Sequence, residues 1–300
     1  MKRLKKILFP TDFSKASNHA LPHTIELAKN YGAEVTMIHV RTPYADDPAT
    51  EEYHFFDENR YLEFIEKELR KRSESIEAVK VNSLIHRDVS PASGILEYSD
   101  EHEIDLIVMG THGKSALGRF FLGSVAERVV RHSMIPVLTV APKRADYRDN
   151  PHYRTILATF DFSQHSRFSV CRAQELARVY GADLKILYVI EQEILPGYYE
   201  AWKQQVDLEK PELVASARRS LLEALGEECM EGVSVHVEVG DGDGRVHRDI
   251  KSFALRHEVD LIVIGTHGLS GVEHMLLGST TERMIRIAPC PVLTLHPGDS

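Results

Sequence analysis

The chain is poor in cysteine and tryptophan, and it lacks long apolar runs. Its 300 residues include three cysteines and one tryptophan. Cys171, Cys229 and Cys290 are odd in number and widely spaced, which excludes a disulfide framework and a zinc-binding pattern. No apolar run approaches the roughly 20 residues of a membrane span, and only "ILF" follows the basic N-terminal residues. We therefore expect a cytoplasmic protein with no membrane partner.

An excess of positive charge is also missing. The formal net charge is −9, and residues 146–300 carry 16 Lys and Arg against 24 Asp and Glu. Proteins that bind nucleic acid present a basic surface, so we expect no nucleic-acid partner. The acidic second half is either a solvated surface or a docking face for a basic partner.

Several motifs of known chemistry are missing from the sequence. It contains no G-x-x-x-x-G-K-[ST] phosphate loop, and "GDGDGR" at 240–245 fails the dinucleotide pattern because its last residue is arginine. His19 and His23 have the spacing of metal ligands on a helix, but no third ligand is evident. No Ser/His/Asp or Cys/His constellation can be placed, so we assign no catalytic residue and no metal ligand.

The sequence does contain a tandem repeat. At an offset of 149 residues, 13 of the 34 positions from 7 to 40 are identical. At an offset of 155, 19 of the 36 positions from 105 to 140 are identical, whereas residues 41–80 and 190–231 show no convincing match. A polar stretch with one proline joins the copies, as expected of a linker. We predict two domains, over residues 1–145 and 152–300.

Each copy alternates short apolar runs with helical patterns. In the first copy, runs at 5–12, 34–40, 80–87, 105–110 and 136–140 predict strands. Helices are expected from Ser14 or Ser17 to about Asn30, over 60–76, from Ser90 onward, and around 124–132. Pro22 indicates either a kink or a late start of the first helix. This alternation predicts an α/β fold with a parallel sheet covered by helices on both faces.

Glycines follow the fourth strand of each copy at the same spacing. "GTHGKSALGRFFLGS" at 110–124 corresponds to "GTHGLSGVEHMLLGS" at 265–279. In parallel sheets, ligands bind beyond the carboxyl ends of the strands, and glycine lets a backbone approach a ligand closely. The Gly-Ser pair precedes a helix, whose free N–H groups attract phosphate. The motif therefore predicts two turns that bind a polyphosphate, although glycine turns and helix caps without a ligand remain the alternative.

The combined pattern resembles the universal stress protein family. It consists of G-x2-G-x9-G-[ST] after "DLIVMG", a final "PVLTV" strand, and "ILFPTDFS" near the N-terminus. The resemblance covers both copies. It implies, for each copy, a five-stranded parallel sheet flanked by helices, a Rossmann-like fold of the adenine nucleotide alpha hydrolase-like type.

The resemblance also implies ATP binding. In the family, the aspartate after the first strand and the valine that ends the second line the nucleoside. Asp12 and Asp161 could instead cap the helices that begin near Ser14 and Ser163, and the two roles are compatible. The expected binding residues of the first copy are Thr11, Asp12, Val40, Met109, Gly110, Gly113, Gly123, Ser124 and Val125. Those of the second copy are Asp161, Val189, Ile264, Gly265, Gly268, Gly278, Ser279 and Thr280.

The second copy departs from the first beside this expected site. Phe160 replaces Thr11, and its ring would either stack on adenine or block it. Thr280 replaces Val125 and adds a hydroxyl that can donate to phosphate. The resemblance further implies pairing through the last strand of each domain, which a tandem chain can satisfy internally through "VLTV" and "VLTL". A homodimer of the whole chain is left open.

Three functions are compatible with these patterns. The first is a cytoplasmic stress-response protein that binds ATP, or a related adenine nucleotide, as a regulatory ligand. The second is an interaction scaffold that works without nucleotide, with the acidic second half as its partner surface. The third is an ATPase or phosphotransferase, with Mg²⁺ bound by the nucleotide. Because no catalytic base is evident, any hydrolysis should be slow.

Overall fold

The structure, a computed structural model of the chain, divides into two compact units, Met1–Pro142 and Lys143–Ser300. It describes residues 4–42, 58–111, 122–142, 147–190, 199–226, 233–239, 245–266 and 277–296, without the side chains of residues 58 and 199–210. Within these ranges, no helix combines the length and apolar character that crossing a membrane requires.

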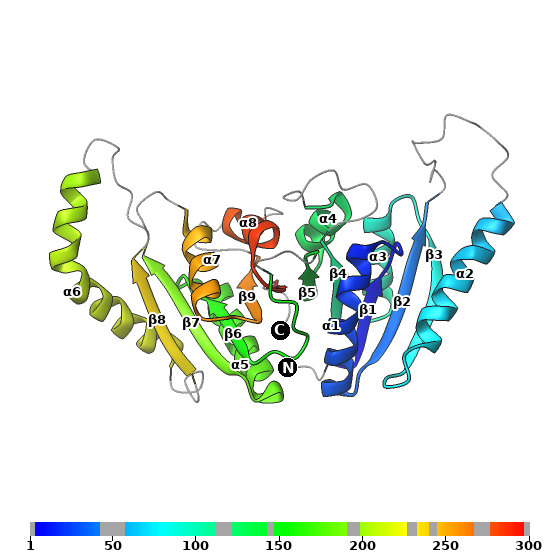
Figure 1. Cartoon of the computed structure of the whole chain (residues 1–300), viewed down its shortest axis with the longest axis horizontal. Coiled ribbons are helices and arrows are strands. Elements are labelled where there is room, and N and C mark those ends of the chain that lie inside the picture. The colour runs from blue at the N-terminus through cyan, green and yellow to red at the C-terminus, as the bar shows by residue number, and fades with distance from the viewer. Residues whose placement is uncertain are drawn as a thin grey trace. The chain divides into compact units, whose positions relative to one another are not determined.

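The first unit alternates strands and helices in the predicted order (Figure 1). Its elements are β1 (Lys6–Pro10), α1 (Lys15–Tyr31), β2 (Glu34–Arg41), α2 (Glu58–Glu74), β3 (Val81–Arg87), α3 (Pro91–Glu101), β4 (Leu106–Gly110), α4 (Ser124–His132) and β5 (Val137–Val140). Helix α1 begins at Lys15 and contains Pro22, so the late start that was one alternative is wrong.

The second unit repeats this order. Its elements are β6 (Thr155–Thr159), α5 (Gln164–Tyr180), β7 (Asp183–Ile190), α6 (Tyr199–Leu225), β8 (Val233–Val239), α7 (Val246–Arg256), β9 (Leu261–Gly265), α8 (Ser279–Ile287) and β10 (Val292–Leu295). The predicted fold class is confirmed in both copies.

The strands of each unit form a parallel sheet in which the order reverses once. The order is β3-β2-β1-β4-β5 in the first unit and β8-β7-β6-β9-β10 in the second. Crossovers in parallel sheets are right-handed, so the reversal after β3 places α3 and α4 on the face opposite α1 and α2. Accordingly α3 packs against α4, while α1 lies on β1 and β4. The reversal opens a crevice between β1 and β4, at their carboxyl ends.

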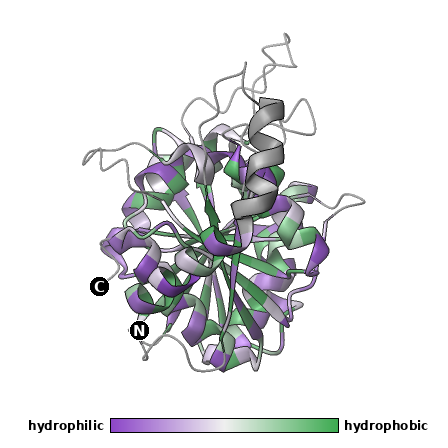
Figure 2. Ribbon diagram, turned by 90° about the vertical axis from the view of Figure 1, so that its left-hand side faces the viewer, coloured by the Kyte–Doolittle hydropathy of each residue, from purple (hydrophilic) through white to green (hydrophobic). Residues whose placement is uncertain are grey.

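The core of each unit lies on the central strands, which are apolar on both faces. Ile7, Leu8 and Phe9 of β1 are fully buried, as are Ile156 and Leu157 of β6. Figure 2 shows the apolar residues gathered along the strands and the polar residues on the outer sides of the helices. This burial supplies most of the stabilisation of a parallel sheet.

An aspartate before the fourth strand fixes the start of the first strand in both copies. Asp105 Oδ2 accepts hydrogen bonds from the backbone N–H groups of Lys5 (2.8 Å) and Lys6 (2.9 Å). Asp260 Oδ2 does the same for Arg154 (2.9 Å) and Thr155 (3.1 Å). The aspartate of "DLIV" therefore has a structural role: it joins β1 to β4, and β6 to β9, at the end opposite the crevice.

Candidate functional site

The crevice of the first unit contains a cavity of about 450 Å³. The carboxyl ends of β1, β2 and β4 and the starts of α3 and α4 surround it. Its lining residues are Pro10, Thr11, Asp12, Ser17, Ile38, His39, Val40, Pro91, Ile95, Met109, Gly110, Thr111, Gly123, Ser124, Val125 and Ala126. The structure thus brings together every expected binding residue of the first copy except Gly113, which lies outside the described residues, as does Gly268 of the second copy.

A tight turn after β1 orients Asp12 at the cavity. Asp12 Oδ1 accepts a hydrogen bond from the backbone N–H of Ser14 (2.9 Å), and Ser14 Oγ accepts one from the N–H of Ser17 (3.1 Å). Ser14 is therefore the N-cap of α1, and Asp12 braces this cap rather than forming it. The alternative that Asp12 itself caps α1 is therefore wrong, and its carboxylate lines the cavity.

Phe13, inside this turn, has the left-handed conformation that bulky residues rarely adopt. Its φ is 64°. The ring stacks on His39 with a centroid distance of 4.9 Å, and the Arg72 guanidinium lies 4.7 Å from the ring centroid on the ring face. His39 in turn makes a 2.8 Å hydrogen bond from Nδ1 to the carbonyl oxygen of Thr11. These contacts stabilise a strained backbone beside Asp12, and such strain is concentrated at functional sites.

Gly110 ends β4 at the floor of the cavity, where it lies against α1. A Cβ atom at this position would lie 2.7 Å from the carbonyl oxygen of Ala16 and 3.1 Å from the amide nitrogen of Ser17. No side chain fits there, since both neighbours are backbone atoms. The sequence suggested that this glycine allows a ligand to approach, but in the described residues the close neighbour is the first turn of α1.

The N-terminus of α4 forms one wall of the cavity. Gly123 is its N-cap, without a side-chain cap hydrogen bond, and the amide of Gly123 donates to the carbonyl of Thr111 (2.7 Å). Ser124, Val125 and Ala126 of the first turn line the cavity. An uncapped helix start presents N–H groups and the positive end of the helix dipole, so this wall suits an anion.

The remaining walls are mostly apolar. Ile38 and Val40 of β2, Ile95 of α3 and Met109 of β4 contribute them. The cavity thus combines an apolar slot, one carboxylate and a helix N-terminus, which suits a ligand with a flat ring, hydroxyl groups and phosphate. The sequence did not predict the other lining residues, although Ile38 and Ile95 belong to predicted elements that end or begin at this edge. These residues are Pro10, Ser17, Ile38, His39, Pro91, Ile95, Thr111 and Ala126.

The corresponding turns of the second unit have the same backbone design. Asp161 Oδ1 accepts hydrogen bonds from Ser163 N (3.0 Å) and Ser163 Oγ (2.6 Å), and Phe162 has a φ of 67°. The N–H of Gly278 donates to the carbonyl of Thr266 (2.8 Å), and α8 also starts without a side-chain cap. Duplication has therefore preserved both the braced carboxylate and the uncapped helix.

The side chains beside Asp161 differ from those beside Asp12. Phe160 is 4% exposed and packs edge-on against Phe162 at 5.1 Å between centroids. Phe162 packs in turn on Tyr188, which replaces His39. Aromatic rings therefore occupy the region where the first unit has the hydroxyl of Thr11.

Comparisons with known proteins agree with this geometry. The model of the "Universal stress protein family" matches residues 3–141 and 152–296. A universal stress protein of Methanocaldococcus jannaschii is 41% identical over 145 residues, which are 47% of this chain and 84% of that protein. One from Mycolicibacterium smegmatis is 27% identical over 307 residues and covers 97% of both chains. The crystal structure of a universal stress protein from Archaeoglobus fulgidus aligns with a TM-score of 0.67 and 25% identity over 99% of both chains.

Proposed function

Since the chain belongs to the universal stress protein family through both of its halves, we propose that its first domain binds ATP or a related adenine nucleotide. The nucleotide acts as a regulatory ligand in a cytoplasmic stress response. The observation that carries the proposal is one cavity lined jointly by Asp12, by Val40 and by the start of α4.

Each part of the nucleotide has a counterpart on the cavity wall. Val40 offers an apolar surface to adenine, and the Asp12 carboxylate accepts hydrogen bonds from ribose hydroxyls. The N–H groups that follow Gly123 donate to phosphate. A volume of about 450 Å³ is within the usual range for small-molecule sites.

Mg²⁺ fits this site only if phosphate oxygens supply most of its ligands. Mg²⁺ prefers oxygen ligands, and Asp12 is the one carboxylate among the lining residues. In the proposed complex, Asp12 contacts the ribose rather than the phosphates. Mg²⁺ would therefore be held mainly by phosphate oxygens, and by the Ser124 hydroxyl within the protein.

We extend the proposal to the second domain, with an altered affinity. Asp161, Val189 and Gly278–Thr280 correspond to the proposed nucleotide contacts, and Ile264 and Gly265 end β9 as Met109 and Gly110 end β4. The Thr280 hydroxyl adds a donor for phosphate. Phe160, being buried against Phe162, offers at most its ring edge to a ligand.

Ser124→Asp separates nucleotide binding from folding. An aspartate in the first turn of α4 would repel the phosphates while it stabilises the helix through the dipole. We expect the ATP affinity of the first site to fall at least about tenfold, equivalent to ~1.4 kcal/mol, with an unchanged or higher melting temperature. Calorimetric titration of the full chain with ATP and Mg²⁺ measures the affinity of both sites.

Ser279→Asp is the matched variant at the second site. If both sites bind, each variant should remove one of two binding events. The proposal fails if the purified chain releases no nucleotide on denaturation and if added ATP does not raise the melting temperature of the protein. It also fails for the first site if Ser124→Asp binds as the unaltered chain does.

Two other functions make different predictions. A scaffold that works without nucleotide would keep its stress protection when Gly113 and Gly268 are replaced by bulky residues. A phosphotransferase or ATPase would turn over ATP far above the background rate, with a dependence on Mg²⁺ and on one side chain. Turnover with and without Mg²⁺ distinguishes the enzyme from the regulatory binder.

A further inference from the structure

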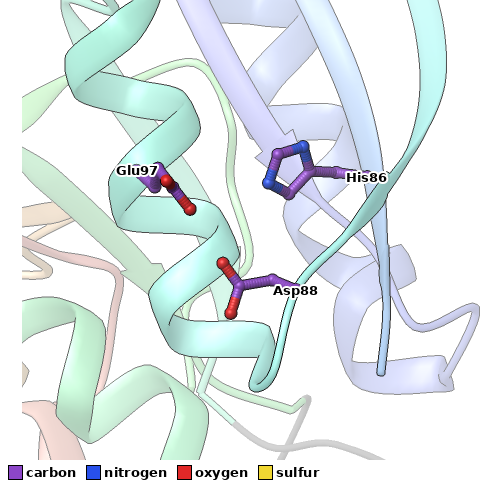
Figure 3. Close-up of side chains that lie close together, drawn as sticks. All are labelled: His86, Asp88 and Glu97. Carbon is purple, nitrogen blue, oxygen red and sulfur yellow. The ribbon is translucent and has the colours of Figure 1, made fainter. Parts of the chain in front are cut away.

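Three side chains that bind metals lie together in the first domain, outside the residues that line the cavity. His86 is near the end of β3, Asp88 follows that strand, and Glu97 is in the second turn of α3. One potential ligand atom from each lies within 4.8 Å of the others. Figure 3 shows the ring of His86 pointing toward the two carboxylates.

The Nε2 atom of His86 is shielded from solvent and has no hydrogen-bond partner among the described residues. A buried polar atom left unpaired costs about 1–3 kcal/mol, so such an atom calls for an explanation. The ring is held edge-on to Tyr98 at 5.9 Å between centroids, which leaves Nε2 toward Asp88 and Glu97.

Gly94 allows α3 to approach these side chains. A Cβ atom on Gly94 would lie 3.0 Å from Cδ2 of His86 and 2.9 Å from Cβ of Asp88. Any larger residue would push α3 away from the end of β3. The histidine and the carboxylates are therefore brought together by helix packing.

Hydrogen bonds orient the Asp88 carboxylate. Its Oδ1 accepts from Ser93 Oγ (2.7 Å) and from the backbone N–H of Ser90 (3.0 Å). Supporting bonds of this kind orient the first ligands of a metal site. The Ser93 hydroxyl and the Ser90 amide also lower the pKa of Asp88. The carboxylates of Asp88 and Glu97 lie close together, so a cation between them would remove a repulsion of like charges.

We propose that His86, Asp88 and Glu97 bind one divalent transition-metal ion, with Zn²⁺ as the best fit. One imidazole and two carboxylates are ligands that zinc accepts, and three protein ligands leave a fourth position for water. Ligand atoms on one tetrahedral zinc lie roughly 3.4 Å apart, since each is about 2.0–2.2 Å from the ion. Rotation of the exposed Glu97 side chain provides the required approach.

The second copy does not repeat two of these three ligands, His86 and Glu97. Val40 pairs with His86 in the first sheet, and the equivalent Val189 pairs with Glu238 in the second. At the offset of 155, Ser252 replaces Glu97. The proposed ion is therefore specific to the first domain, and it does not depend on nucleotide binding.

Glu97→Gln and Glu101→Gln form a matched pair for the test. Both remove one negative charge from the exposed face of α3, but only Glu97 is a proposed ligand. Zn²⁺ is titrated calorimetrically into the full chain and each variant, without nucleotide. We expect the site to be weakened at least tenfold by Glu97→Gln and to stay within twofold in Glu101→Gln.

His86→Gln and Co²⁺ provide the second measurement. Bound Co²⁺ should give visible absorption in the unaltered chain, and this absorption should be lost in both His86→Gln and Glu97→Gln, while circular dichroism verifies that each variant is folded. The proposal is overturned if the folded variants bind Zn²⁺ and Co²⁺ as tightly as the unaltered chain. Equal losses in Glu101→Gln, or no binding to any form, would overturn it as well.

Discussion

At the scale of single residues, Gly110 of the glycine motif has a role in the packing of the fold that requires no ligand. Gly110 is required because the first turn of α1 lies against it, and this contact fixes the position of Asp12 relative to β4. Asp105 has a similar structural role at the other end of the strands, where it accepts hydrogen bonds from two backbone N–H groups. The stretch "DLIVMG" of the first copy, which is "DLIVIG" in the second, therefore has structural roles at both of its ends.

Gly110→Ala should destabilise the first domain by about 2 kcal/mol, because the methyl group overlaps backbone atoms of α1 that cannot rotate away. Gly32→Ala is the comparison, since Gly32 has a φ of 64° but no atom near the added Cβ, and it should cost only about 1 kcal/mol. Urea denaturation of both variants gives the two values. A Gly110→Ala chain as stable as the unaltered one would contradict the packing argument.

At the scale of elements, β8 contains a histidine where β3 has leucine. His236 pairs with Leu187 of β7, and in the first unit Leu84 pairs with Ile38 of β2. Burial lowers the pKa of His236, and the positive charges of Lys185 and His257 add to this effect. Nearby Asp183 and Glu238 oppose it. The folded second domain therefore favours neutral His236.

His236→Leu should make the second domain less sensitive to acid. As the pH falls below the ordinary histidine pKa of about 6.5, the unfolded chain binds a proton that the folded chain does not. The stability provided by the neutral ring is present above this pH and is lost as the pH falls toward the folded pKa. Circular dichroism of the unaltered chain and the variant follows acid unfolding at different pH values. Equal acid sensitivity in the variant would contradict the pKa shift.

At the scale of the whole molecule, each of the two units repeats the same order of five strands around a core of its own. All residues that line the cavity lie between Pro10 and Ala126, within the first unit. Pairing of the two copies through their last strands, and a homodimer of the whole chain, stay predictions, which chemical cross-linking and measurement of the molar mass in solution would test.

A fragment of residues 1–142 should fold and bind ATP with an affinity within about threefold of that of the first site in the full chain. This range corresponds to a difference of ~0.7 kcal/mol in binding free energy. Circular dichroism establishes the folding, and calorimetry measures the affinity. A fragment that folds but does not bind would mean that the second unit contributes to the first site.

The sequence alone determined the order of the elements and the duplication, and it placed the cap of the first helix at Ser14, Ser17 or Asp12. These features depend on residues close together in the chain: Ser14 contacts Ser17, three positions away, and Asp12 contacts Ser14, two positions away. Pattern and spacing therefore predicted α1, β4 and the turn with Asp12. The pattern predicted that the glycines after β4 lie at this edge of the sheet, because carboxyl ends of parallel strands lie together. Asp12 and Val40 were implied by the resemblance to the family.

Only the tertiary structure decided the contacts between residues distant in the chain. Gly110 meets Ala16, and His39 bonds to the carbonyl of Thr11, through a sheet register that no local pattern specifies. His86 and Asp88 lie close together in the sequence, but Glu97 joins them only because Gly94 lets α3 approach the ends of β2 and β3. Local sequence sets dihedral preferences and caps, whereas such long-range contacts follow from close packing of the complete domain.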